Sequence, residues 1–356
     1  MQTPWGFPDF DAHEVLHFVH DAATGLRAII AIHSTHLGPA AGGTRFWHYA
    51  DDADALTDAL RLSRGMSFKN AMAGLPLGGG KAVILAPADR SKTPALLAAF
   101  GLAINRLGGQ YVTAEDVGMS VTDMIEIARK TRFVAGLPVA GGAVGGDPGP
   151  HTSLGVFLGI KAAVKRALGK DSVAGLRIAL QGAGSVASGV AMHAAAEGAT
   201  LIIADVDSAR AHALATQVSG SVVDPAALLA TPADVVSPCA LGAILTEQGI
   251  AALDTPIVAG GANNQLATRA DGERIHARGI LYAPDYVINA GGIINVSTEY
   301  VRDGDASLVR QRIEAIPARL EQIWADSASS NRNPAEVADA MAMALIGREA
   351  ISLIGR

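Results

Sequence analysis

The segment from Gly182 to Ala187 constrains the fold of this chain more than any other feature of the sequence. It has the pattern G-x-G-x-x-A and follows an apolar run at residues 177–180 that is typical of a buried strand. The residues after it have a helical pattern, and a second apolar run at 200–204 then ends at Asp205. This succession predicts a doubly wound, parallel α/β domain of the Rossmann type.

The same segment predicts a dinucleotide site, with an α/β domain that binds no nucleotide as the alternative. Gly182 permits the tight turn, Gly184 lets the backbone approach a pyrophosphate, and Ala187 lets the helix pack closely on the strand. The first amides of the helix can donate to phosphate oxygens. They belong to Ser185 and Val186. Asp205 can accept from ribose hydroxyls and repels a 2′-phosphate, so the pattern favours NAD over NADP.

Length and composition agree with a protein built from two domains. The chain has 356 residues, of which 49% are hydrophobic and 17% charged, as expected of a globular protein. Aromatic residues make up only 4%, while there are 40 glycines. A core of small aliphatic residues with many tight turns suits a parallel α/β architecture better than a β-sandwich.

The charge balance and the cysteine content exclude several classes of protein. The net charge of −6, without a basic cluster, argues against a nucleic-acid partner. The single cysteine, Cys239, excludes an intrachain disulfide framework and a thiolate zinc site, and we expect no metal. No apolar run is long enough to span a membrane, and the start of the chain has no signal-peptide pattern. We therefore expect a soluble, cytoplasmic protein.

The order of strand and helix patterns predicts where the domains lie. Before residue 140 the chain has strand patterns at 27–32 and 81–85 and helix patterns at 54–64 and 93–107. A stretch rich in Gly and Pro at 136–150 then suggests a junction. We expect a mixed-sheet α/β domain over residues 1–140, joined by C-terminal helices at 325–356. The Rossmann domain is expected over residues 141–324.

Two lysines stand in an apolar, glycine-rich stretch between Met66 and Lys81. Most lysines are solvated surface residues, but the neighbours of Lys69 and Lys81 argue for burial. The triple glycine at 78–80 suggests that the backbone approaches something small at this point. Repulsion between two buried ammonium groups, together with their desolvation, would lower the lysine pKa toward the range useful to a general base.

Several motifs together give a resemblance to a known family over nearly the whole chain. They are the segments 38–45, 66–81, 113–118, 238–242, 261–265 and 283–292. With these motifs the chain resembles the glutamate/leucine/phenylalanine/valine dehydrogenase superfamily, and most of all its leucine dehydrogenases, with the phenylalanine dehydrogenases next. The resemblance implies a substrate-binding and oligomerisation domain followed by an NAD-binding domain, a cleft between the two, and a homo-oligomer.

The resemblance also implies a mechanism. Lys69 would hold the substrate α-carboxylate with help from the backbone at Gly42 and Gly43. After hydride leaves Cα for NAD, Lys81 would activate the water that adds to the iminium. Asp116 would exchange protons with the departing amine.

Other residues are assigned by the resemblance to the cofactor and to the substrate side chain. The resemblance places Thr152, Cys239, Ala240 and Asn263 beside the cofactor, with Asn263 also near the substrate amine. The side-chain pocket is lined by Ala41, Ala114, Ile293 and Val296. None of these can pair with a γ-carboxylate, so glutamate is disfavoured. Leucine, valine and isoleucine are favoured. Phenylalanine is the alternative substrate, because leucine dehydrogenases usually have leucine at the position of Ala41. An alternative from another class of function is a catalytically silent NAD-binding regulatory protein.

Overall fold

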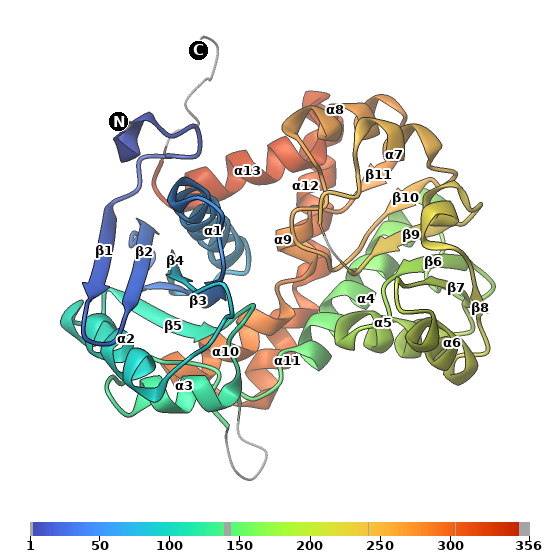
Figure 1. Cartoon of the computed structure of the whole chain (residues 1–356). Helices are drawn as coiled ribbons and strands as arrows, with labels where there is room; N and C mark the ends of the chain where they lie inside the picture. Colours follow the sequence, from blue (N-terminus) through green and yellow to red (C-terminus); the bar gives the residue numbers. More distant parts are fainter. Residues whose placement is uncertain (1–2, 139–143, 241, 303, 349–356) are drawn as a thin grey trace. The chain divides into compact units, whose positions relative to one another are not determined.

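The computed structural model describes residues 3–138, 144–240, 242–302 and 304–348 (Figure 1). The chain divides into two compact units. The first comprises Met1–Gly146, Val296–Ala306 and Ala342–Arg356. The second comprises Asp147–Asn295 and Ser307–Met341.

The first unit contains a five-stranded mixed sheet, as expected. Its strands are β1 (Val15–Asp21), β2 (Leu26–Ser34), β3 (Ala40–Trp47), β4 (Gly78–Leu85) and β5 (Tyr111–Glu115). They lie in the order β1-β2-β4-β3-β5. β2 is antiparallel to both β1 and β4, whereas β3 is parallel to both β4 and β5. A short 3₁₀ turn, η1 (Pro4–Gly6), precedes the sheet.

Helices cover both faces of this sheet (Figure 1). They are α1 (Asp52–Met72), α2 (Pro94–Arg106) and α3 (Val121–Ala128). On one face, Leu56 and Leu60 of α1 pack against Val83. On the other, Phe100 of α2 and Met124 of α3 pack in a core with strand residues such as Phe46 and Ile84. Each strand in the middle of the sheet is therefore buried on both sides, which explains its nearly continuous apolar sequence.

Helix α1 is longer than the helix pattern at residues 54–64 predicts. It begins where the Asp51 side chain accepts from the amide of Ala53, and it has acidic residues in its first turn. It then continues through the lysine-containing segment to Met72, so that Lys69 lies in its last turn. One rigid helix therefore determines where this lysine lies.

The triple glycine corrects an expectation drawn from the sequence. Residues 78–80 belong to β4, and what approaches their backbone is the protein itself. A Cβ at Gly79 would lie 2.0 Å from the Ser67 amide nitrogen on α1. A Cβ at Gly78 would lie 2.0 Å from the Ser34 carbonyl, and one at Gly80 would lie 2.8 Å from a ring carbon of Tyr111. Gly79 is thus needed for close packing of α1 on β4, whereas Gly78 and Gly80 allow close contacts with Ser34 of β2 and Tyr111 of β5.

We predict that Gly79→Ala destabilises the protein. The added methyl would press on the backbone of α1, and overpacking of this kind typically costs about 1–3 kcal/mol. Gly65→Ala is the matched control, since a Cβ at this mid-helix position of α1 would meet nothing within 4 Å. That change should instead stabilise by about 0.5–1 kcal/mol. Chemical denaturation of both variants measures the two effects, and equal stability would contradict this packing.

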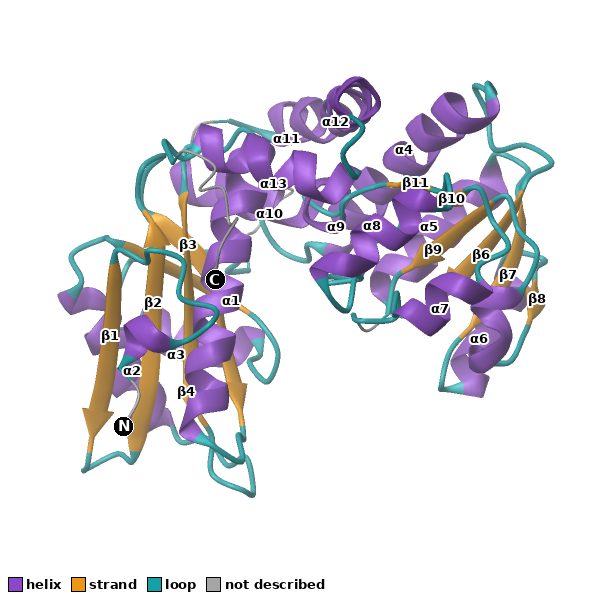
Figure 2. Cartoon of the chain, turned by 90° about the horizontal axis from the view of Figure 1, so that it is seen from above, coloured by secondary structure: helices purple, strands orange, loops and turns teal. Residues whose placement is uncertain are grey.

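The second unit contains a six-stranded, wholly parallel sheet (Figure 2). Its strands are β6 (Arg177–Gln181), β7 (Thr200–Ala204), β8 (Ser221–Val222), β9 (Val235–Pro238), β10 (Ile257–Val258) and β11 (Leu281–Tyr282). They lie in the order β11-β10-β9-β6-β7-β8. The order reverses beside the central strand β6, and this is the Rossmann arrangement that the glycine segment predicts.

Helices and a 3₁₀ turn connect these strands. They are α5 (Ser185–Ala196), α6 (Ser208–Gln217), η2 (Pro225–Ala230), α7 (Glu247–Ala252) and α8 (Arg269–Ala277), with α4 (Gly149–Leu168) before the sheet and α9 (Asp285–Ile288) after it. The chain ends with α10 (Gly291–Val301), α11 (Ala306–Glu314), α12 (Ile316–Ser330) and α13 (Pro334–Leu345). Among the described residues, none of the helices is apolar over a length that could cross a membrane.

The two units depart from the expected domain limits in the C-terminal part of the chain. Residues 296–306 lie in the first unit, whereas residues 325–341 lie in the second. Helix α12 packs against α4 and α9, and Trp324 donates from its ring nitrogen to the carbonyl of Tyr282 over 2.8 Å. These contacts hold α12 to the parallel sheet. The expected limit between residues 140 and 141 falls outside the described residues.

Candidate functional site

Lys81 lies between the sheet of the first unit and helix α1. Alternate residues of β4 face the same side, and on this side Gly79 faces Ser67 and Val83 packs against α1. Lys81, between them, shares that face, and only 5% of the residue is exposed. The expected burial of this lysine is confirmed, whereas Lys69 in the last turn of α1 is only partly buried.

Asp116 is the anion that Lys81 meets. The Lys81 Nζ lies 2.6 Å from Asp116 Oδ2, just after the end of β5. Asp116 can take this position only because residue 43 is a glycine, since a Cβ at Gly43 would lie 2.8 Å from the Cβ of Asp116. Asp116 Oδ2 is buried and faces two cations, Lys81 and, at 3.4 Å, Arg45. The position of this oxygen is thus fixed by opposite charges.

Burial and neighbouring charges shift the pKa of both groups. Burial lowers the pKa of Lys81, Asp116 opposes that change, and the positive charge of Arg45 adds to it. Burial would raise the pKa of Asp116, but Lys81 and then Arg45 outweigh it and hold the pKa below its ordinary value. The expected fall in the pKa of Lys81 is confirmed. The expected cause was Lys69, but the cation among the main causes is Arg45.

The glycine and alanine residues predicted to lie near the substrate occupy adjacent strands. Gly43 of β3 pairs with Ala114 of β5, and Gly42 pairs with Thr113. The carbonyl of Gly42 accepts a hydrogen bond of 2.6 Å from the hydroxyl of Tyr111. These residues therefore form one continuous stretch of sheet beside Asp116.

Ala41 belongs to a small apolar cluster of the first unit. Its other buried members are Leu77, Val112 and Ala135, and Val296 and Tyr300 of α10 pack against them. The structure thus places Val296 with Ala41, as the sequence predicts. Ile293 lies in the second unit, at the other end of the same helix.

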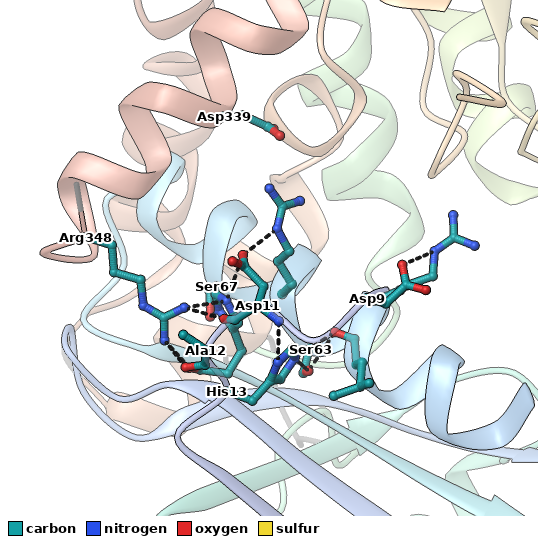
Figure 3. A network of polar contacts seen from close by, with 12 residues as sticks. Asp9, Asp11, Ala12, His13, Ser63, Ser67, Asp339 and Arg348 are labelled. Carbon is teal, nitrogen blue, oxygen red and sulfur yellow. Dashed lines mark hydrogen bonds and ion pairs between the residues drawn. The ribbon is translucent and has the colours of Figure 1, made fainter. Parts of the chain in front are cut away.

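A polar network holds the part of α1 that precedes Lys69 (Figure 3). The Nδ1 atom of His33 and the hydroxyl of Ser67 form a hydrogen bond of 2.7 Å. Arg348 donates to the carbonyl of His33 over 2.6 Å and to that of Ala12 over 3.0 Å. The network joins β2, α1 and the segment before β1, and it holds α1 at Ser67, two residues before Lys69. Among the described residues, no three His, Cys, Asp or Glu side chains form a group that could hold a metal ion.

The glycine turn of the second unit has the geometry of a dinucleotide site. Gly182 has a φ of +100°, which favours glycine, and a Cβ there would lie 3.1 Å from that of Ala240. Gly184 is exposed, with nothing within 4 Å of its Cβ position. No side chain caps the amides of Ser185 and its successors at the start of α5. Open space over uncapped helix amides fits a pyrophosphate.

Asp205 is held beside this turn by backbone amides. Its Oδ2 atom accepts from Ala183 over 2.7 Å, and its Oδ1 atom accepts from Asp207 over 2.8 Å. The carboxylate at the end of β7 therefore has a set direction and remains partly exposed. Ala187 is fully buried, as close packing of α5 on the sheet requires. The residues present fit a nicotinamide dinucleotide.

The remaining predicted cofactor residues lie in the same unit. The Sγ of Cys239 accepts from the amide of Gly261 over 3.3 Å, and burial raises the pKa of this thiol. Asn263 accepts at Oδ1 from Asn289 over 2.8 Å. Thr152 lies in the first turn of α4, where its hydroxyl donates to the carbonyl of Pro148. Cys239 and Ala240 lie beside the Gly182 turn.

Comparisons with known proteins show the family of this chain. Residues 13–133 match the model for "Glu/Leu/Phe/Val dehydrogenase, dimerisation domain", and residues 208–347 match the model for "Glutamate/Leucine/Phenylalanine/Valine dehydrogenase". The chain belongs to this family. It is therefore an amino-acid dehydrogenase, an oxidoreductase that uses a nicotinamide cofactor.

Three relatives illustrate the similarity. Leucine dehydrogenase of Geobacillus stearothermophilus is 45% identical, over 94% of this chain and 90% of that protein. Valine dehydrogenase of Streptomyces virginiae is 42% identical, over 94% of each chain. The crystal structure of L-tryptophan dehydrogenase from Nostoc punctiforme superposes with a TM-score of 0.83 at 38% identity, covering 94% of this chain and 96% of that one.

Sequence reasoning assigned no role to two residues that the dehydrogenase fold places beside the sites. Arg45 ends the family motif at 38–45 and lies against Asp116. Asn289 belongs to the motif at 283–292 and donates to Asn263 and to the Gly261 carbonyl. Both residues belong to the family motifs, and this membership was the sequence signal that could have identified them. Their roles depend on contacts between residues far apart in the chain.

Proposed function

We propose that this dehydrogenase oxidatively deaminates an apolar L-amino acid with NAD, giving the 2-oxo acid, NADH, ammonium ion and a proton at the expense of one water. The observation that carries the proposal is the ion pair of the buried Lys81 with the partly buried Asp116, with 2.6 Å between Nζ and Oδ2. An amine whose pKa is lowered by burial can act as a base toward water. A silent nucleotide-binding protein would have no use for this pair.

Each charged group has a separate task in the proposed reaction. Lys69 binds the substrate carboxylate through a charge-assisted hydrogen bond, near the backbone of Gly42 and Gly43. NAD, when bound, would supply the acceptor for the hydride of Cα. Lys81 removes a proton from the water that adds to the resulting iminium carbon, and it stabilises the carbinolamine. Asp116 passes a proton to the amine nitrogen, which then leaves as ammonia.

The chemistry of the residues that the family resemblance assigns to the substrate side chain supports an apolar substrate. Ala41, Ala114, Ile293 and Val296 carry no group that could pair with a γ-carboxylate, and burying that charge unpaired would cost several kcal/mol. We therefore propose leucine, valine and isoleucine as the favoured substrates. Phenylalanine is the second candidate, because the small side chain of Ala41 leaves room for a larger one.

A panel of substrates tests the proposal. NADH absorbance would be followed with NAD and each of L-leucine, L-valine, L-isoleucine, L-phenylalanine, L-tryptophan, L-glutamate and lactate. We expect turnover with the apolar amino acids and little with glutamate or lactate. A kcat/KM for phenylalanine above that for leucine would overturn the aliphatic preference alone. Turnover of lactate without any amino acid would overturn the reaction.

We predict that Asp205→Ala reduces the preference for NAD over NADP. The change removes both an acceptor for the ribose hydroxyls and the charge that repels a 2′-phosphate. The ratio of kcat/KM for NAD to that for NADP should fall by about tenfold or more, since a good hydrogen bond to a charged group contributes about 1.5–3 kcal/mol. Asp207→Ala, two residues on, is the control. An unchanged ratio in Asp205→Ala would show that this carboxylate does not reach the ribose.

We also propose that the enzyme is a homo-oligomer. The first unit matches a dimerisation-domain model, and its edge strand β1 carries Phe18 with 63% of its surface exposed. Light scattering should give a molar mass that is a multiple of 36.3 kDa. A mass of one chain at micromolar concentration would refute the proposal.

A further inference from the structure

Arg45 joins three elements of the first unit around the Lys81–Asp116 pair. It lies on β3, and its NH1 atom is 2.8 Å from Asp58 Oδ2 on α1. Its Nε atom is 3.4 Å from Asp116 Oδ2, the same oxygen that faces Lys81. One guanidinium thus lies between a structural carboxylate and the carboxylate of the proposed reaction.

We propose that Arg45 is a positioning residue: anchored by Asp58, it directs Asp116 toward Lys81 and holds a fixed positive charge beside the pair. The inference rests on the proposed function. It adds to the site a residue that acts through Asp116 and Lys81.

The anchoring explains how the guanidinium is held in one place. Asp58 accepts from Arg45 and also from the hydroxyl of Tyr49, over 2.7 Å. A guanidinium is planar and its donors have set directions, so a hydrogen bond at NH1 limits where Nε can lie. The Nε atom is buried, and it makes no hydrogen bond of good angle with any described residue. It meets Asp116 as a charge, which leaves the carboxylate able to take and give a proton.

The fixed charge acts on both members of the pair in the same direction. Arg45 lowers the pKa of Lys81 and also that of Asp116, whereas the two members of the pair shift each other in opposite directions. The charged groups that act on Lys81 come from three elements: Asp116 after β5, Arg45 on β3 and Asp58 on α1. Tyr111 of β5 is the further titratable group that Asp116 influences. Asp116 and Asp58 both raise the pKa of Lys81. Without Arg45 the positive charge that opposes them would be lost, and the pKa of Lys81 would rise.

The experiment compares three variants of the full-length enzyme. Arg45→Gln removes the charge, and Arg45→Lys keeps the charge but not the planar fork. Arg27→Gln is the matched control, because Arg27 also joins a strand of this sheet to α1, through the exposed partner Asp52. The measurement is kcat/KM for the best amino acid as a function of pH, together with thermal unfolding of each variant.

Loss of the positive charge and loss of the guanidinium geometry should have different effects on the kinetics. In Arg45→Gln the rising limb of kcat/KM, which reports loss of a proton from Lys81, should move to higher pH. The value at neutral pH should fall by about tenfold or more. In Arg45→Lys the limb should stay near its wild-type position while kcat falls by about tenfold to 10²-fold through misplacement of Asp116. Arg27→Gln should change neither quantity.

Other outcomes overturn the inference. A lower kcat/KM in Arg45→Gln with an unmoved limb would mean that Arg45 only supports the fold. Full kcat in Arg45→Lys would refute the positioning role, and it can be measured even if Arg45→Gln does not fold. Labelling of Lys81 by acetic anhydride across pH, read by mass spectrometry, measures its ionisation without turnover. If the wild-type enzyme deaminates no amino acid, the proposed function fails, while labelling still decides whether Arg45 acts on Lys81.

Discussion

Lys81→Ala should lower kcat by at least about 10²–10⁴-fold with a smaller change in KM. The lysine is buried between β4 and α1, and in the proposed reaction it is the group that takes the proton from the water. Its removal also leaves the partly buried Asp116 without its nearest counter-ion. Steady-state kinetics with NAD and the best amino acid measures the effect. An added primary amine should restore part of the activity.

Lys69→Ala is the comparison that separates catalysis from binding. A carboxylate held by Lys69 is bound in both the ground state and the transition state, so its loss should mainly raise KM. The ionisation of Lys81 should survive in the pH profile of this variant and disappear in Lys81→Ala. Turnover near the wild-type rate in Lys81→Ala would show that β4 only binds the substrate.

Asp116→Asn should also lower kcat by about 10²–10⁴-fold, because an amide cannot exchange a proton with the amine nitrogen. The pH dependence gives a second test of this assignment. Asp116 raises the pKa of Lys81, so its loss should lower that pKa further. The rising limb of kcat/KM should therefore move to lower pH, which is opposite to the shift expected for Arg45→Gln. The pH profile of the residual activity measures this direction.

Asp52→Asn provides the control for that shift. It keeps Asp116, Lys81 and Arg45, and it changes an exposed carboxylate of α1 that pairs with Arg27. A residual kcat in Asp116→Asn as high as that of Asp52→Asn would show that the carboxylate of Asp116 does not transfer protons. A limb that moves to higher pH in Asp116→Asn would contradict the ion pair with Lys81.

Much of the second unit could be predicted from local sequence. The strands at 177–181 and 200–204 and the turn at Gly182 follow from an apolar run, a glycine with positive φ and a carboxylate at a strand end. Each of these signals acts within a few residues, so it can be recognised without knowing the rest of the fold. The contact of Cys239 and Ala240 with the turn could not be read from local sequence, since parallel strands bring together segments far apart in the chain.

The first unit shows where local reasoning fails. The triple glycine has the composition of a ligand-binding loop, but in the structure it is a strand packed against α1. Composition cannot distinguish these cases, because both need a backbone without side chains. The cation that acts on Lys81 was expected to be its sequence neighbour Lys69. It is Arg45, from an adjacent strand.

By itself, the sequence determined the class of fold, the dinucleotide turn and the family, since these depend on local periodicity and on motifs that can be read directly. Only the tertiary structure decided which charges meet. The 2.6 Å contact of Lys81 with Asp116, the anchoring of Arg45 by Asp58 and the attachment of α12 to the parallel sheet each join elements separated by loops and helices. The interaction of charges depends on their distance in space and on their burial, and neither can be inferred from the order of the residues.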